Sequence, residues 1–82
     1  MNIRAKLTTE FNTFPCLVEG KSEETIKIEF ESPEATQLMI SDPEREGVVS
    51  FTGEEGPVEV KVIVPGELVP ESGVNDVVFK IA

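Results

Sequence analysis

The sequence predicts one small all-β domain, either an immunoglobulin-like antiparallel β-sandwich or a barrel, with about seven short strands. Apolar and polar residues alternate with a period of two in several segments, and turn signals rich in Pro and Gly separate these segments at nearly regular intervals. No segment shows the 3.6-residue period of a helix over eleven or more residues. The 82 residues are enough for one hydrophobic core and too few for two, so the domain spans residues 1–82.

The alternation is clearest in residues 26–31 (IKIEFE) and 58–64 (VEVKVIV). Each segment predicts a strand with one buried and one solvated face. Residues 3–9 and 76–81 alternate in the same way, which places both ends of the chain in the sheet. Residues 59 and 61, both charged, lie on the solvated face of the second segment and protect it against aggregation.

Three shorter apolar segments, residues 16–19, 37–40 and 48–52, predict the remaining strands. Residues 42–47 (DPEREG) predict a single helical turn, with Pro at its first position and Gly at its end. Residues 65–75 form the longest segment without a strand pattern and are expected to be a loop. The predicted turns are residues 19–21, 32–34, 41–43, 52–57 and 65–66.

Sixteen acidic residues against seven basic ones give a net charge of −9, which repels nucleic-acid phosphates and anionic membranes. We therefore expect no direct nucleic-acid or membrane partner. Arg4 and Lys6 fall on the outward face of the first strand, which makes one side less negative. The single cysteine excludes an intrachain disulfide, and no signal peptide or 18-residue apolar segment is seen. A cytoplasmic or intracellular protein is expected, including one incorporated in a virus particle.

The residue types argue against catalysis. Histidine is absent, which removes the side chain most often used for proton transfer near neutral pH. The sequence has no G-x-S-x-G, no S-x-x-K and no Gly-rich phosphate loop. Cys16 lies in an apolar run without a nearby cation to lower its pKa, so we expect it in the core. We predict no enzyme activity, no cofactor and no small-molecule substrate.

Clustered acids are the only candidate metal ligands. Residues 42–47 follow the start of a calcium loop, but the twelfth position is Gly53 and not the required Glu. Residues 23–24 and 54–55 are acidic pairs in predicted turns, where carboxylates stay hydrated. We expect solvated surface charge in all three places and no metal site.

Five apolar residues are candidates for binding a partner. Ile63 and Val78 interrupt the alternation and put apolar side chains on the predicted solvated face. Leu68, Val69 and Val74 lie in the 65–75 loop. The alternatives are that the strand pattern slips by one residue at Ile63 and Val78, and that the loop residues close the end of the core.

Two functions fit these observations. The leading hypothesis is a non-catalytic structural or assembly module that binds protein, including copies of itself, like the decoration or tail proteins of virus particles. Association is expected through a strand edge, the Ile63 and Val78 region, or the 65–75 loop. The alternative is an acidic inhibitor that mimics nucleic-acid charge and blocks a basic protein groove. Its contacts would come from Glu19, Glu23, Glu24, Glu44, Glu46, Glu54 and Glu55.

Overall fold

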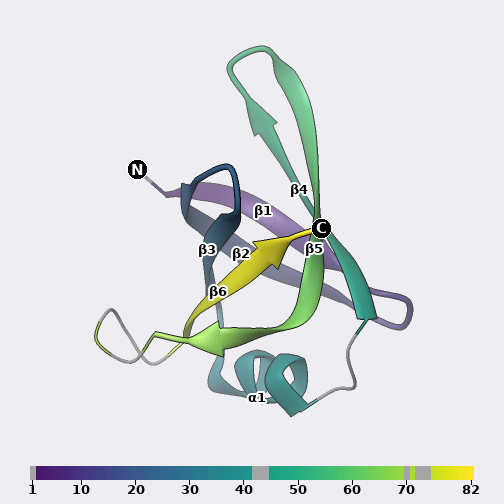
Figure 1. Ribbon diagram of the computed structural model, residues 1–82, viewed down its shortest axis with the longest axis vertical. Coiled ribbons are helices and arrows are strands. Elements are labelled where there is room, and N and C mark those ends of the chain that lie inside the picture. The colour runs from purple at the N-terminus through teal and green to yellow at the C-terminus, as the bar shows by residue number, and fades with distance from the viewer. Residues whose placement is uncertain (1, 42–44, 70, 72–74) are drawn as a thin grey trace.

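The computed structural model describes residues 2–41, 45–69, 71 and 75–82, and it shows a closed six-stranded antiparallel β-barrel with one short helix (Figure 1). The all-β prediction is confirmed, and the barrel alternative is the correct one. The elements are β1 (Ile3–Thr8), β2 (Thr13–Lys21), β3 (Thr25–Phe30), α1 (Pro33–Ser41), β4 (Arg45–Gly53), β5 (Gly56–Leu68) and β6 (Asp76–Ile81). No helix among the described residues is long and apolar enough to cross a membrane.

The strand order around the barrel is β1-β2-β3-β6-β5-β4, and β4 pairs back onto β1. Because the barrel is closed, each strand in the described part of the chain has a hydrogen-bonded neighbour on both sides. The expectation of association through a free strand edge therefore has no wholly unpaired strand to support it among the described residues, and association itself stays a prediction. It assumed an open sandwich, whose outer strands would leave backbone groups unpaired.

The period-two pattern correctly predicted the core. Most inward residues of β1, β3, β5 and β6 are buried, and three phenylalanines meet in the interior. The ring of Phe30 lies edge-on to Phe14 and Phe79, with centroids 6.0 and 6.2 Å apart. Cys16 is 2% exposed and belongs to this core, as predicted.

The helix was not predicted, because residues 37–40 had been interpreted as a strand. They lie in α1, which begins directly after Ser32. The Ser32 hydroxyl accepts a hydrogen bond from the Ala35 amide at 3.2 Å, and Pro33 occupies the first helical position. Thr36 and Met39, one turn apart, are buried, and Figure 1 shows α1 below the barrel. Nine residues are too few for the helical period to stand out in the sequence.

The predicted helical turn over residues 42–47 was also wrong in its second half. Residues 42–44 lie outside the described residues, while residues 45–47 belong to β4 and pair with β5. Gly47 packs inward, where an added Cβ would lie 3.1 Å from side-chain atoms of both Leu7 and Val64. Pairing with β5 satisfies the backbone and overrides the local preference of the DPEREG segment.

The predicted turn over residues 19–21 lies three residues further along the chain. Strand β2 continues to Lys21 after an irregularity in its pairing with β3 between Val18 and Gly20. The turn is formed instead at Ser22, whose hydroxyl accepts hydrogen bonds from the Glu24 amide at 3.3 Å and the Thr25 amide at 3.1 Å. This irregularity keeps Glu19 within the strand.

The prediction of a loop over residues 65–75 was wrong in its first part, because β5 continues to Leu68, while residues 70 and 72–74 lie outside the described residues. The pairing of β5 with β6 shifts between Ile63 and Glu67, so the strand bulges there. At Gly66 an added Cβ would lie 2.5 Å from the backbone oxygen of Val78. Glycine is needed at this position because the backbone of β6 approaches so closely.

Candidate functional site

The outer wall formed by β2, β3, β6 and β5 carries two features, an apolar hollow and a cluster of carboxylates. In this wall β3 and β6 pair in the register Lys27↔Val78 and Glu29↔Asp76. Because side chains alternate along a strand, these four residues lie on the face opposite the core. The hollow and the carboxylate cluster therefore lie at successive outward-facing residue pairs of β3 and β6.

The hollow lies where β5 bulges against β6. It has a volume of about 230 Å³ and is lined by Thr25, Ile63, Pro65, Gly66, Glu67, Val78 and Lys80. Ile63 and Val78 are both half-buried in its wall. Two of the predicted partner-binding residues, one from each strand, are thus brought together on the outside of the barrel.

The other predicted partner-binding residues do not line this hollow. Leu68 is 44% exposed and pairs with the inward-facing Val77. Val69 is half-buried, and its amide donates a hydrogen bond to the backbone oxygen of Asp76 at 2.9 Å. Val74 lies outside the described residues. Of the five candidates, Ile63 and Val78 are the two that line the hollow.

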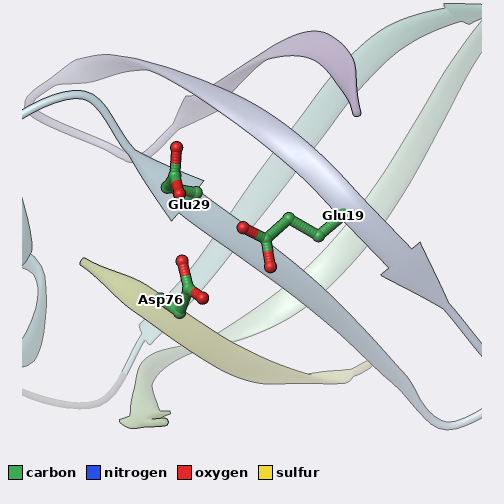
Figure 2. Close-up of side chains that lie close together, drawn as sticks. All are labelled: Glu19, Glu29 and Asp76. Atoms are coloured by element: carbon green, nitrogen blue, oxygen red, sulfur yellow. The ribbon is translucent and has the colours of Figure 1, made fainter. Parts of the chain in front are cut away.

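Three carboxylates from three strands gather beside the hollow. Glu19 comes from β2, Glu29 from β3 and Asp76 from the first position of β6, as Figure 2 shows. One carboxylate oxygen of each residue lies within 4.8 Å of the other two. Neighbouring strands place these acids together although they are far apart in the sequence.

Asp76 is the most unusual member of the cluster, since it is only 1% exposed. Its Oδ1 atom is buried and has no hydrogen-bond partner among the described residues. Two backbone hydrogen bonds hold the main chain here. The Asp76 backbone oxygen accepts a hydrogen bond from the Val69 amide, and the backbone oxygen of the preceding Asn75 accepts one from the Phe30 amide at 3.1 Å. The Asn75 side chain accepts a further bond from the Thr36 hydroxyl of α1 at 3.2 Å.

The cluster has an excess of negative charge. An ion pair joins Lys27 Nζ to Glu19 Oε2 at 3.5 Å. Burial, the nearby Asp76 carboxylate and a hydrogen bond to it raise the pKa of Glu19 above its usual value, and Lys27 partly opposes this rise. Three carboxylates against one ammonium can attract a proton or a hard cation.

Sequence reasoning missed this cluster. Glu19 had been assigned to an acidic partner surface, and neither Glu29 nor Asp76 had been singled out. The outward position of Glu29 was visible in the alternation, but its pairing with Asp76 depends on the register between β3 and β6. The expectation of no metal site considered only acids that are close together in the sequence. Acids that the strand register brings together from distant parts of the chain give no such local signal.

The acidic pairs that had been singled out lie in solvent. Residues 23–24 are exposed in the turn between β2 and β3, and residues 54–55 are exposed at the tip of the β4–β5 hairpin. Glu46 is an exposed residue of β4, while Asp42 and Glu44 lie outside the described residues. The side chains of residues 23–24 and 54–55 are exposed to solvent, as expected for turns.

A wider groove of about 610 Å³ lies between β1–β2 and the projecting β4–β5 hairpin. Arg4 and Lys6 line it and point outward, as predicted, but Glu31 and Glu59 line it as well. Charges of both signs therefore balance within the groove. The sequence had suggested a less negative side around Arg4 and Lys6, and these acids reduce the difference.

Cys16 offers no reactive thiol. Burial, and to a lesser extent the charge of Glu31, raise the pKa of Cys16 from its ordinary 9.0 to about 12, although a backbone hydrogen bond with Leu7 lowers it somewhat. The thiol therefore stays protonated near neutral pH, and nucleophilic chemistry needs the thiolate.

No protein-family model, curated protein or solved structure matches this chain.

Proposed function

We propose that this chain is a non-catalytic module that binds protein, and that a second copy of the chain is the first partner to test. The observation that supports this proposal is the convergence of Ile63 and Val78 on the outer wall of the barrel. Both side chains are apolar at outward positions, where a strand with one solvated face normally carries polar residues. Apolar side chains that stay partly exposed on an outer wall are typical of an interaction site.

The size of the hollow favours a protein side chain over a small ligand. Its volume of about 230 Å³ is below the range of roughly 300–1,000 Å³ that is usual for small-molecule sites. Glu67 and Lys80 line it with opposite charges. In a two-fold dimer, Glu67 of one copy can face Lys80 of the other, so the surface is complementary to itself.

The chemistry of the chain supports a non-catalytic role. The sequence has no histidine, and its one thiol is buried with a raised pKa. An assembly component, such as a decoration or tail protein of a virus particle, is the setting that we propose for such a module. A role in assembly requires only a stable fold and a surface that recognises its partner.

The acidic inhibitor is the second candidate. The exposed acids of residues 23–24 and 54–55 on two hairpin turns favour it, because they are available to a basic surface. Glu19 fits it less well, since its carboxylate faces Glu29 and Asp76 and pairs with Lys27. Binding through exposed charges weakens with salt, whereas apolar association does not.

The test is the solution mass, measured by light scattering over a hundredfold range of protein concentration in 0.1 and 0.5 M NaCl. We expect an oligomer that persists in high salt and that Val78→Lys dissociates. Thr8→Lys is the matched control, because Thr8 is an exposed residue of β1, three strands away from β6 around the barrel. This control should associate like the natural protein.

Three results would contradict the proposal in different ways. A monomer under all conditions would exclude copies of this chain as the partner. Dissociation by both lysine variants would mean that added charge, and not the hollow, controls association. An assembly that disappears in 0.5 M NaCl would favour electrostatic binding and the acidic-inhibitor hypothesis.

A further inference from the structure

We propose that Glu19, Glu29 and Asp76 form a binding site for a divalent metal ion, with calcium as the best fit. The site lies on the same outer wall as the hollow but uses different residues, so it does not depend on the proposed protein binding. It also departs from the sequence-based expectation, which found no metal site.

The argument begins with the buried carboxylate of Asp76. Removing a carboxylate from water is costly unless hydrogen bonds or an opposite charge compensate for the loss of hydration. Asp76 is 1% exposed, and its Oδ1 atom has no donor among the described residues. Figure 2 shows this carboxylate directed towards that of Glu19, which is itself an acceptor when ionised. A positive partner for this Oδ1 atom therefore belongs within the cluster.

The spacing of the oxygens is close to that of a calcium site. Calcium binds oxygen at 2.3–2.6 Å, so two ligands on opposite sides of the ion are about 4.6–5.2 Å apart, and ligands at smaller angles are closer together. No two of the oxygens of Glu19, Glu29 and Asp76 are more than 4.8 Å apart, so a small side-chain movement lets all three reach one calcium ion. Magnesium binds at 2.0–2.1 Å, which limits the separation to about 4.2 Å and requires near-ideal octahedral geometry. Calcium tolerates this arrangement with less rearrangement.

The ligand set also favours a hard cation. All three donors are carboxylate oxygens, which prefer calcium, magnesium or manganese over the softer transition metals. They project from three hydrogen-bonded strands, so the backbone holds them in place before an ion arrives. Lys27 Nζ, 3.5 Å from Glu19, compensates part of the charge, and its bond to Glu19 would weaken when calcium binds.

The competing explanation is that a proton fills the same role. The raised pKa of Glu19, together with its hydrogen bond to Asp76, is consistent with a proton shared between these two carboxylates. A proton and a calcium ion both relieve the repulsion, but only calcium makes the effect depend on metal concentration. The two explanations therefore give different results when calcium is added at constant pH.

The experiment is calorimetric titration of CaCl₂ into the full chain after treatment with EDTA, at pH 7 in 0.1 M NaCl. The chain contains neither Trp nor Tyr, so a fluorescence readout is weak and heat is the better signal. We expect one saturable site per chain, and a melting temperature that rises with calcium concentration. The melting temperature should rise less with MgCl₂ at the same concentration.

Asp76→Asn should weaken calcium binding at least tenfold. This variant removes a buried charge and keeps the shape of the side chain, so it should still fold, which its melting curve will verify. Glu54→Gln is the matched control, because it removes one negative charge from the exposed hairpin tip and should leave the affinity unchanged.

Two results would overturn the proposal. The first is the absence of saturable calcium heat together with a melting temperature that is the same in calcium and EDTA, which would leave the proton as the partner of Asp76. The second is an equal loss of binding in Asp76→Asn and Glu54→Gln, which would show that calcium responds to net charge and not to this cluster.

Discussion

Strands β3 and β6 have two faces, which share one backbone but differ in the burial and the chemistry of their side chains. On the inner face Ile28 and Phe79 are fully buried in an apolar core. On the outer face the same two strands carry Glu29 and Val78, which belong to the carboxylate cluster and to the hollow. The core on the inner face is determined by the number of apolar residues and their period along each strand. The cluster and the hollow on the outer face are determined by the register, which decides which residues of adjacent strands lie next to each other.

This difference explains why a buried charge can occur on the solvent side of a barrel. Asp76 points away from the core, yet it is 1% exposed, because the surrounding chain covers it. The core keeps the barrel closed, and the closed barrel holds the three strands that carry the carboxylates in register. The core residues themselves do not belong to the cluster. Substitutions on the two faces should therefore separate stability from binding.

The largest effect is expected for neighbouring residues of β6 on opposite faces. Phe79→Ala empties the centre of the core and should lower the free energy of unfolding by about 3–5 kcal/mol, which leaves a domain of this size marginal or unfolded. Val78→Ala removes two methyl groups from a half-buried outer position and should cost less than about 1 kcal/mol. Urea denaturation followed by circular dichroism measures both. Similar losses would refute the division between faces.

The second test concerns the bulge that forms the hollow. Gly66→Ala places a Cβ 2.5 Å from the Val78 oxygen and 2.7 Å from a Val77 methyl group, so β5 must move. We expect a loss of about 1–3 kcal/mol, together with weaker association. Gly20→Ala is the matched control, because nothing lies within 4 Å of its added Cβ. Equal effects of the two substitutions would show that the close approach of β6 is unimportant.

The third test concerns the buried charge itself. In EDTA, Asp76→Asn should raise the free energy of unfolding by about 1–3 kcal/mol, because it removes a buried negative charge whose Oδ1 atom has no hydrogen-bond partner. In saturating calcium the order should reverse, since only the natural protein gains from binding. Denaturation curves in the two buffers provide the comparison. A variant that is less stable than the natural protein in EDTA would contradict the unpartnered state of Asp76.

The smallest effect near neutral pH concerns Cys16 on the inner face. Its folded-state pKa of about 12 exceeds its ordinary 9.0, so the unfolded chain loses the thiol proton first as pH rises. The stability due to the protonated thiol is complete below pH 9 and decreases towards pH 12, by about 1–2 kcal/mol at pH 10. The natural protein should therefore lose stability more steeply than Cys16→Ala between pH 8 and 10. Parallel pH profiles would contradict this.

The sequence predicted the inner face well, and the reason is physical. The alternation in residues 26–31 and 58–64 reports directly which side chains are buried, because a strand has a period of two. Ser32 and Pro33 also marked the start of α1, but they had been interpreted as a turn, since a nine-residue helix shows little periodicity. Local signals of this kind indicate a boundary without deciding which element follows it.

The outer face could be predicted only in part. The interrupted alternation at Ile63 and Val78 was visible, and the structure places both in one hollow. The carboxylate cluster was not visible, because the Glu29↔Asp76 pairing and the irregularity before Gly20 set the register of three strands. Register arises from the closure of the whole barrel, and no local segment encodes it.

The most direct test of a functional outer wall is a residue-resolved amide NMR titration of the full chain with CaCl₂. We predict saturable shifts centred on Glu19, Glu29 and Asp76, which extend along β6 towards Val78, with little change at residues 54–55. Small shifts that do not saturate and that spread over every acidic turn, residues 23–24 and 54–55 included, would contradict the assignment of this wall as the binding surface.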